Sequence, residues 1–177
     1  MSVLAISREK APLLGVQFDV VKLIEVEPAL QSAAESAITA VWRRHMNEPT
    51  SVNLSFASAV ILQLPNGTTE PVEALYQGDT DTIMIALGTL REHYPEAPLE
   101  VVTSLYAAHE ARHKVHYAIG DIPPDRNEGT TSDAYLASRH EVEAWESAMD
   151  AFSDIYPYTL IDLSLGSRTY TNRKLIY

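Results

Sequence analysis

The chain of 177 residues contains no cysteine. Disulfide bonds and thiolate metal sites are therefore excluded, and any bound metal ion must be held by His, Asp or Glu side chains. Basic residues are also scarce, because 13 Lys and Arg stand against 24 Asp and Glu and give a formal net charge of −11. This charge argues against a partner that is nucleic acid or an anionic membrane surface, since both require clustered positive charge.

Long apolar runs are missing as well. The apolar start of the chain is interrupted by Arg8, Glu9 and Lys10 before a signal-peptide core could form. No later stretch reaches the roughly 18 apolar residues that a membrane helix needs. We therefore expect a soluble, cytoplasmic protein, and the chain length favours a single domain over residues 1–177.

Hydrophobic periodicity predicts an α+β fold. Three helices are expected, over residues 28–46, 98–118 and 132–154, the last capped by Ser132 or Asp133. Three strands are expected, over residues 52–64, 71–77 and 82–87, and Asn66-Gly67 indicates a hairpin between the first two. These strands would form a small, mostly antiparallel sheet. The segment 121–131 is typical of a surface loop, whereas the pattern of 158–177 does not assign a structure.

The second expected helix carries the sequence His109-Glu110-Ala111-Arg112-His113. Residues four apart lie one turn apart on the same face of a helix, so the two histidines can converge on one metal ion. Glu110 is offset around the helix, where its carboxylate can reach a metal-bound water without occupying a ligand position. The pattern predicts a zinc site at which Glu110 is the general base.

The competing interpretation is a helix face whose histidines simply pack in the core. The stripe that ends in His109, His113 and His116 begins with apolar residues at the same helical spacing, so imidazoles replace apolar side chains in successive turns. A single core histidine would need no special explanation, but two or three on one stripe need partners. Zinc or a similar metal ion supplies such a partner.

A catalytic zinc ion usually has three protein ligands. The metzincin pattern cannot provide the third, because Ile119 stands where that motif has its last histidine. In the downstream helix, Glu141 falls within an inward stripe of small and apolar residues, and a buried carboxylate is costly unless it is paired or binds a metal. Glu141 is therefore the strongest candidate, whereas Glu143 groups with polar residues on a face expected to be solvated.

His109, His113 and Glu141 together resemble the site of a gluzincin, a zincin-type metallopeptidase with two histidines on one helix and a glutamate on the next. Residues 141–144, Glu-Val-Glu-Ala, are similar to the Glu-x-x-Ala-Asp/Asn element of the M48 and ImmA/IrrE-like peptidases, whose first Glu binds zinc. The resemblance covers residues 99–152. It implies a zincin-like domain in which Glu141 is the third zinc ligand and Glu110 activates a zinc-bound water that hydrolyses a peptide bond.

The resemblance also implies an edge strand beside the active-site helix, which would hold the peptide or protein substrate, and the strand over 82–87 is the expected one. Trp145 departs from the family pattern, because it stands where those peptidases have an Asp or Asn that supports a zinc-binding histidine. An indole cannot accept that hydrogen bond. Either another acceptor orients the histidine, or the site is weaker than in active relatives.

Several other side chains are secondary candidates. His116 is expected to interact with the dipole at the helix C-terminus, and His140 points about 100° away from Glu141 around its helix. His45 and His93 have no evident partner. Four residues are candidate donors to the oxyanion of the attacked carbonyl: Tyr135, Tyr156, Tyr158 and Arg168.

Two further functions compete with the zinc metallopeptidase. One is a catalytically weak or inactive zincin-like module that binds metal and a protein partner. The other is a di-iron helical bundle, because Glu110 and His113 also form a Glu-x-x-His pair. That reading needs a second such pair, which the sequence lacks, and the predicted hairpin argues against an all-helical fold.

Overall fold

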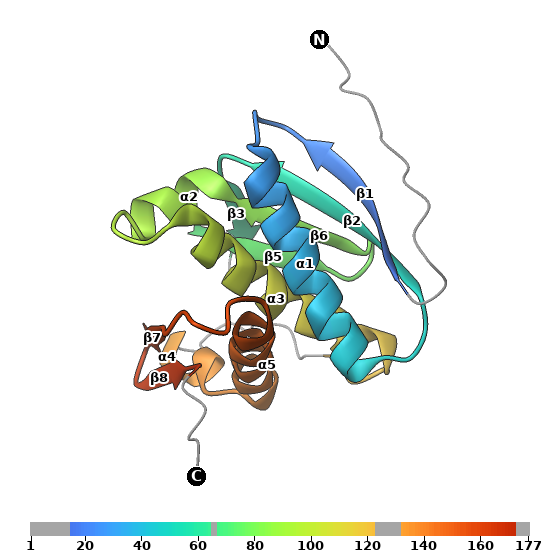
Figure 1. Ribbon diagram of the computed structural model, residues 1–177. Coiled ribbons are helices and arrows are strands. Elements are labelled where there is room, and N and C mark those ends of the chain that lie inside the picture. Colours follow the sequence, from blue (N-terminus) through green and yellow to red (C-terminus); the bar gives the residue numbers. More distant parts are fainter. Residues whose placement is uncertain (1–14, 65–66, 123–131, 173–177) are drawn as a thin grey trace.

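Figure 1 shows the computed structural model of the chain, which describes residues 15–64, 67–122 and 132–172. Its strands are β1 (Val16–Lys22), β2 (Thr50–Ala57), β3 (Val60–Gln63), β4 (Thr69–Val72), β5 (Ala74–Gln77), β6 (Thr82–Ala86), β7 (Asp162–Leu165) and β8 (Arg168–Thr171). Its helices are α1 (Pro28–His45), α2 (Leu87–His93), α3 (Leu99–Ala118), α4 (Ser132–Leu136) and α5 (Arg139–Ile155). The predicted α+β class is confirmed. Within the described ranges, no helix combines the length and apolar character needed to span a bilayer.

The central sheet has the strand order β1-β2-β6-β5. In it β1 is parallel to β2 and β2 to β6, whereas β5 is antiparallel to β6. The other two pairs, β3 with β4 and β7 with β8, are antiparallel. The expected antiparallel pairing is thus found in the hairpins, but the central sheet is mixed. Two parallel pairs make it mixed. One involves β1, which the sequence patterns do not predict and which α1 connects to β2 by a helical crossover, and the other joins β2 to β6 across the intervening strands β3, β4 and β5.

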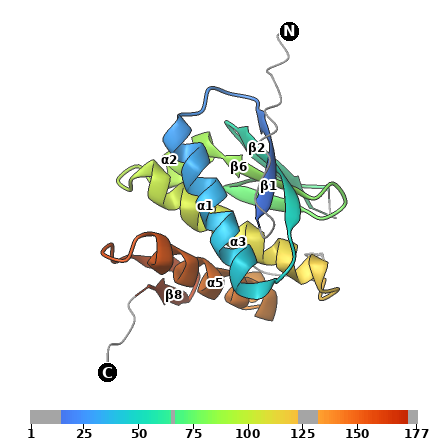
Figure 2. The same ribbon diagram turned by 45° about the vertical axis from the view of Figure 1, so that its right-hand side comes forward.

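The helices form two layers on one face of this sheet. α1 and α3 lie side by side against the strands, and α5 packs on them from the opposite side (Figures 1 and 2). Alternate residues of β2, Val52, Leu54 and Phe56, are at most 1% exposed and face the helices. Because α3 lies between the sheet and α5, every residue from Val102 to Ala111 is buried. The charged motif is therefore set in the central helix of the fold.

Two predicted helices are confirmed with small changes, and the third is divided. The helices over 28–46 and 98–118 correspond to α1 and α3. The helix over 132–154 is interrupted because Ser138 is extended (φ −64°, ψ 152°) between α4 and α5. Ala137 lies in this interruption and is exposed, so it does not belong to the inward stripe of α5.

The predicted hairpin is confirmed in β3 and β4, where Gly67 has a positive φ of 82°. The strand over 71–77 is divided at Glu73, because β4 pairs with β3 whereas β5 joins the central sheet. The strand over 82–87 ends at Ala86, since α2 begins at the next residue. The unassigned C-terminal segment contains the β7–β8 hairpin. The part of the predicted 121–131 loop beyond Ile122 lies outside the described residues.

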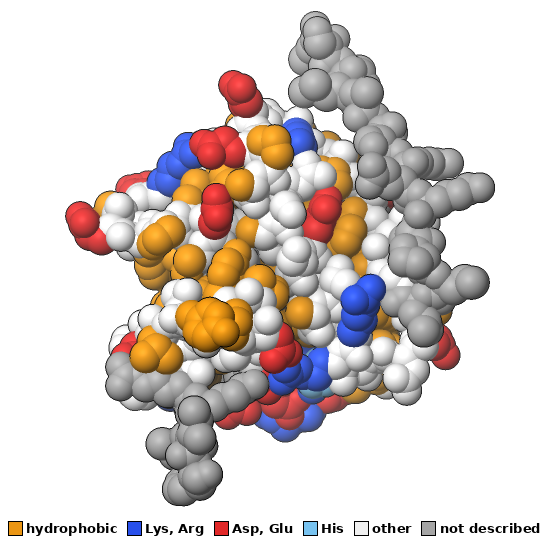
Figure 3. Space-filling view, in the orientation of Figure 1, with side chains coloured by type: hydrophobic (Ala, Val, Ile, Leu, Met, Phe, Trp, Pro, Cys, Tyr) orange, Lys and Arg blue, Asp and Glu red, His pale blue; other side chains and the backbone are white. Residues whose placement is uncertain are grey.

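Hydrophobic side chains on the face drawn in Figure 3 gather over the half that carries α2 and the β7–β8 hairpin, and charged side chains surround them. Two strongly exposed hydrophobic residues lie in the segment between α5 and β7: Tyr158 is 98% exposed and Leu160 is 68% exposed.

Candidate metal centre

Close packing of α3 and α5 brings the predicted ligands together. Small residues make this approach possible, since Ala107, Ala108 and Ala111 of α3 and Ala144, Ala148 and Ala151 of α5 are at most 1% exposed. His109 and His113 lie one turn apart on α3, and Glu141 lies in the first turn of α5. All three side chains are buried.

The three ligand groups form a compact triangle, in which the carboxylate turns a different oxygen toward each imidazole. His109 Nε2 and His113 Nε2 are 3.0 Å apart. The Glu141 carboxylate places Oε2 at 3.3 Å from His109 Nε2 and Oε1 at 3.1 Å from His113 Nε2. Ligand atoms at ~2.05 Å from a tetrahedral ion are separated by about 3.3 Å, so the triangle fits a metal ion with little adjustment.

The chemistry of the donors leads to the same conclusion. An imidazole nitrogen that lacks a proton and a carboxylate oxygen both present lone pairs, and lone pairs that converge on one point are held together by a cation, either a metal ion or a proton carried by an imidazole. Although burial acts to raise the pKa of the Glu141 carboxyl, the neighbouring His109 and His113 hold that pKa well below its ordinary value. The site therefore keeps Glu141 ionised, and His109, His113 and Glu141 could bind a metal ion.

Glu110 lies beside this triangle without belonging to it. Its Oε1 is 3.9 Å from His109 Nε2, and its Oε2 accepts a hydrogen bond of 2.7 Å from the backbone N–H of Tyr76 in β5. Burial raises the pKa of Glu110 from its ordinary 4.5 to about 7, and the charge of Glu141 acts in the same direction, whereas His113 opposes it. A carboxyl group with a pKa near neutrality can both accept and return a proton.

A cavity of about 630 Å³ opens onto these groups. Its walls come from β4, β5, α3, α4 and α5, and the three candidate ligands and Glu110 all line it. No Lys or Arg occurs among the described lining residues, whereas Glu70 and Glu73 add two further carboxylates. This volume is in the range of sites that hold small ligands or a few side chains.

The strand beside α3 differs from the expected one. The strand over 82–87, β6, lies inside the sheet between β2 and β5, and the edge strand is β5. Strand order depends on contacts between distant segments, so local patterns could not identify the edge. Ala74, Leu75 and Tyr76 of β5 line the cavity. The edge strand beside the motif helix is therefore present, but in the preceding segment of the chain.

Trp145 lies against the imidazole of His109, with ring centroids 4.2 Å apart at an interplanar angle of 39°. Tyr106 and Tyr170 contact the indole in turn, at centroid distances of 5.1 and 6.1 Å. Within the described part of the chain, the Nδ1 atoms of His109 and His113 and the indole N–H have no hydrogen-bond partner. Metal-binding histidines usually donate the N–H of their second ring nitrogen to an acceptor. His109 is instead oriented by aromatic packing.

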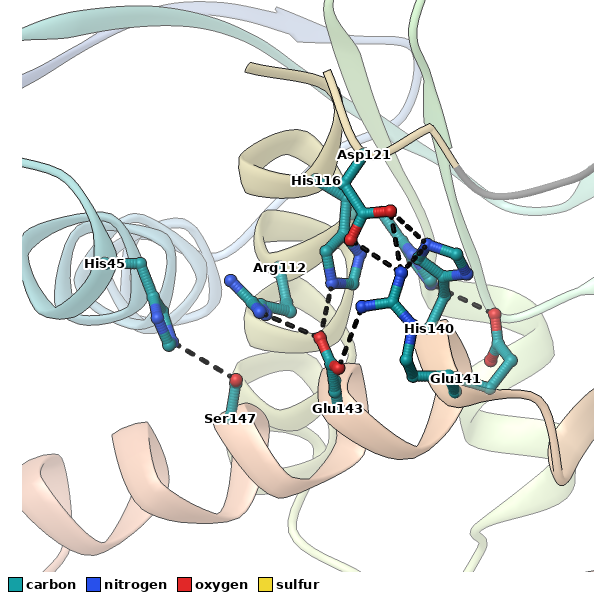
Figure 4. Close-up of polar contacts among 10 residues, drawn as sticks. His45, Arg112, His116, Asp121, His140, Glu141, Glu143 and Ser147 are labelled. Atoms are coloured by element: carbon teal, nitrogen blue, oxygen red, sulfur yellow. Dashed lines mark hydrogen bonds and ion pairs between the residues drawn. The ribbon is translucent and has the colours of Figure 1, made fainter. Parts of the chain in front are cut away.

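Figure 4 shows Glu141 together with polar residues that lie away from the triangle. Glu143 points toward α3, where its Oε2 is 2.9 Å from Arg112 Nη2 and 3.1 Å from His116 Nε2. The prediction of a solvated Glu143 is therefore wrong in part, because these partners leave its side chain only 31% exposed. His140 Nε2 lies 3.1 Å from Asp121 Oδ1, away from the ligands as its position on the helix predicts.

His116 is buried and forms a hydrogen bond with Glu143, which differs from the expected interaction with the helix dipole. The side chain is 0% exposed, and burial lowers its pKa to about 4, so the imidazole is neutral at pH 7. His45 and His93, which had no evident partner, contact Ser147 and Glu73 respectively. These partners lie far along the chain and could not be found from local spacing.

Of the four candidate oxyanion donors, only Tyr135 lines the cavity. The hydroxyl of Tyr156 lies 3.3 Å from Ser104 Oγ, on the side of α3 that faces α1. Tyr158 is almost fully exposed and Arg168 is exposed on β8, and neither is among the cavity residues. Sequence reasoning missed Tyr76, whose contact with Glu110 comes from its backbone and so leaves no signal in residue type.

Comparison with protein-family models and with curated proteins found no match for this chain. The likeness to gluzincins therefore depends on the motif residues and on the geometry described above.

Proposed function

We propose that this protein is a zinc-dependent metallopeptidase. The observation that carries the proposal is the arrangement of His109, His113 and Glu141 as a buried triangle of ligand atoms, with the Glu110 carboxylate beside it and a cavity open to all four. Two imidazoles and a carboxylate, with room for a fourth ligand, form the donor set typical of catalytic zinc. Zinc bound there would polarise the peptide carbonyl and lower the pKa of a coordinated water.

Glu110 is the proton carrier in this proposal. It accepts the proton of the attacking water and returns it to the nitrogen of the leaving amine. The fixed position of its carboxylate, with one oxygen held by Tyr76 and the other facing His109, suits this role.

The peptide substrate would lie along β5. In an antiparallel edge strand, alternate residues direct their backbone N–H and C=O groups away from the sheet. Tyr76 directs its N–H toward Glu110, so the outward groups of this strand face the motif helix. Because the Tyr76 N–H is bonded to Glu110, an extended peptide would pair with the remaining outward groups of this edge, those of Ala74 among them, and would pass the candidate metal centre.

The alternative is a metal-binding module without activity that binds a protein partner. It is favoured by the Nδ1 atoms of His109 and His113, which have no hydrogen-bond partner among the described residues, and by Trp145 at the position of the supporting Asp or Asn. Zinc binding with no turnover of any peptide would support this alternative.

Glu110→Gln tests the proposal directly. The zinc-loaded wild type is expected to cleave a mixed library of unstructured peptides, and the variant should lose activity by about 10²- to 10⁴-fold while it keeps one zinc per chain. Glu92→Gln, on the exposed face of α2, is the matched control and should retain full activity. Equal activity in Glu110→Gln and the wild type would refute the assigned base.

A further inference from the structure

Lys114 directly follows the second motif histidine. It is only 5% exposed although it carries a charge, and its Nζ lies 5.2 Å from the centre of the Trp42 ring. The charge is neutralised by Asp81, whose Oδ1 and Oδ2 are 2.6 and 2.7 Å from Nζ. Burial of a charged group is costly unless it is paired in this way.

Asp81 lies in the turn between β5 and β6 and has a positive φ of 50°. Asp tolerates this conformation better than most residues but still adopts it at a cost in energy. Its Oδ1 also accepts a hydrogen bond of 2.9 Å from the Tyr76 hydroxyl, and its backbone oxygen accepts one from Asn53. Asp81 thus connects α3, β5 and β2.

Tyr76 is held at both ends. Its hydroxyl is bonded to Asp81, and its ring packs edge-on against Tyr117 with centroids 5.3 Å apart. Gly78 leaves room for this contact, since a Cβ there would lie 2.1 Å from the Tyr117 ring. The backbone N–H of the same Tyr76 donates the 2.7 Å hydrogen bond to Glu110 Oε2.

We propose that Lys114 and Asp81 are positioning residues that act through Tyr76 to fix the Glu110 carboxylate, so that Oε1 is the oxygen that carries the proton. Oε2 is occupied by the Tyr76 N–H, and Oε1 faces the ligand triangle at 3.9 Å from His109 Nε2. The inference rests on the proposed peptidase function for its catalytic meaning. The contact between Tyr76 and Glu110 is testable without that function.

Asp81→Asn is the main test variant. Asn keeps the tolerance for positive φ, and the residue is on the surface side of the pair, so the loss of the counter-charge of Lys114 should lower stability without loss of the fold. Loss of the charge releases Lys114 and weakens the hold on Tyr76. With the zinc-loaded enzyme, we expect kcat to fall about tenfold or more with KM within about twofold, as for other residues that support a site indirectly. Asp79→Asn, exposed in the same turn, is the matched control and should change neither.

Hydrogen exchange of the Tyr76 amide provides a second measurement. In the wild type this amide should be protected, in Glu110→Ala it should exchange about tenfold faster or more, and in Asp81→Asn it should exchange faster at unchanged zinc content. Lys114→Met should lower kcat, and Lys114→Arg, which keeps the positive charge, should lower it less. The inference would be overturned if amide protection were unchanged in Asp81→Asn, or if this variant changed KM and left kcat unaltered. If the wild type cleaves no peptide, the proposed function fails. The amide measurements would still show whether Asp81 holds the hydrogen bond between Tyr76 and Glu110 in place.

Discussion

The two sides of α3 support the candidate centre by different means. On the sheet side, the Glu110 carboxylate is fixed by a hydrogen bond from β5, and that strand is tied back to α3 through Asp81 and Lys114. On the α5 side, the imidazole of His109 packs against Trp145, and its Nδ1 has no partner among the described residues. The proposed base is thus oriented by polar contacts, whereas the two histidine ligands are oriented by packing and by Glu141.

Different contacts therefore determine two properties of the centre: the position of its proton carrier and its affinity for zinc. Directional hydrogen bonds fix the position of a carboxylate closely, whereas aromatic packing limits the motion of an imidazole without raising its basicity. We therefore expect a centre with a well-placed proton carrier and a modest affinity for zinc.

The largest expected effect comes from removal of the third ligand. Glu141→Ala should lower zinc affinity by 10³-fold or more, because the site loses both its third ligand and the negative charge that this ligand supplies. Titration calorimetry against a competing chelator measures this change. Glu143→Ala, two residues along the same helix, should leave zinc affinity within about tenfold, since Glu143 bonds Arg112 and His116. Equal losses in the two variants would contradict the ligand assignment.

A smaller effect is expected at Trp145. Trp145→Asn places an acceptor near His109 Nδ1 and should raise zinc affinity by roughly tenfold, the lower end of the range for such supporting groups. Trp145→Phe keeps the aromatic contact and should bind zinc like the wild type. Zinc affinity would be measured at one pH for all three proteins. If folded Trp145→Asn binds zinc more weakly than Trp145→Phe, then aromatic packing, rather than the lack of an acceptor, determines the zinc affinity.

The smallest effect concerns stability on the sheet side. Burial raises the pKa of Glu110 to about 7 in the folded, metal-free protein. The stability contributed by protonated Glu110 is present below pH 4.5 and is lost as the pH rises through 7. Glu110→Gln cannot ionise, so with chelator present it should be more stable than the wild type at pH 8 by on the order of 2 kcal/mol, a gain that shrinks toward pH 5. Thermal melts at the two pH values measure this difference, and a gain independent of pH would contradict it.

The sequence predicts the α5 side of the centre better than the sheet side. His109, His113 and Glu141 follow from helical spacing, since periodicity determines which residues share a face. The contact of Glu110 with Tyr76 and the pairing of Lys114 with Asp81 join segments about 33 residues apart or more, and helix periodicity carries no information about them. For the same reason β1 and the identity of the edge strand were not predictable from local pattern. The break at Ser138 was missed because a helical pattern continues across it.

The central claim is tested most directly by a crystal structure of the zinc-soaked protein with anomalous data collected on both sides of the zinc absorption edge. We predict one anomalous peak, within about 2.0–2.2 Å of His109 Nε2, His113 Nε2 and a Glu141 oxygen. The fourth ligand should be a water within hydrogen-bond distance of Glu110 Oε1. A peak elsewhere, no peak, or a fourth protein ligand that excludes water would contradict the account.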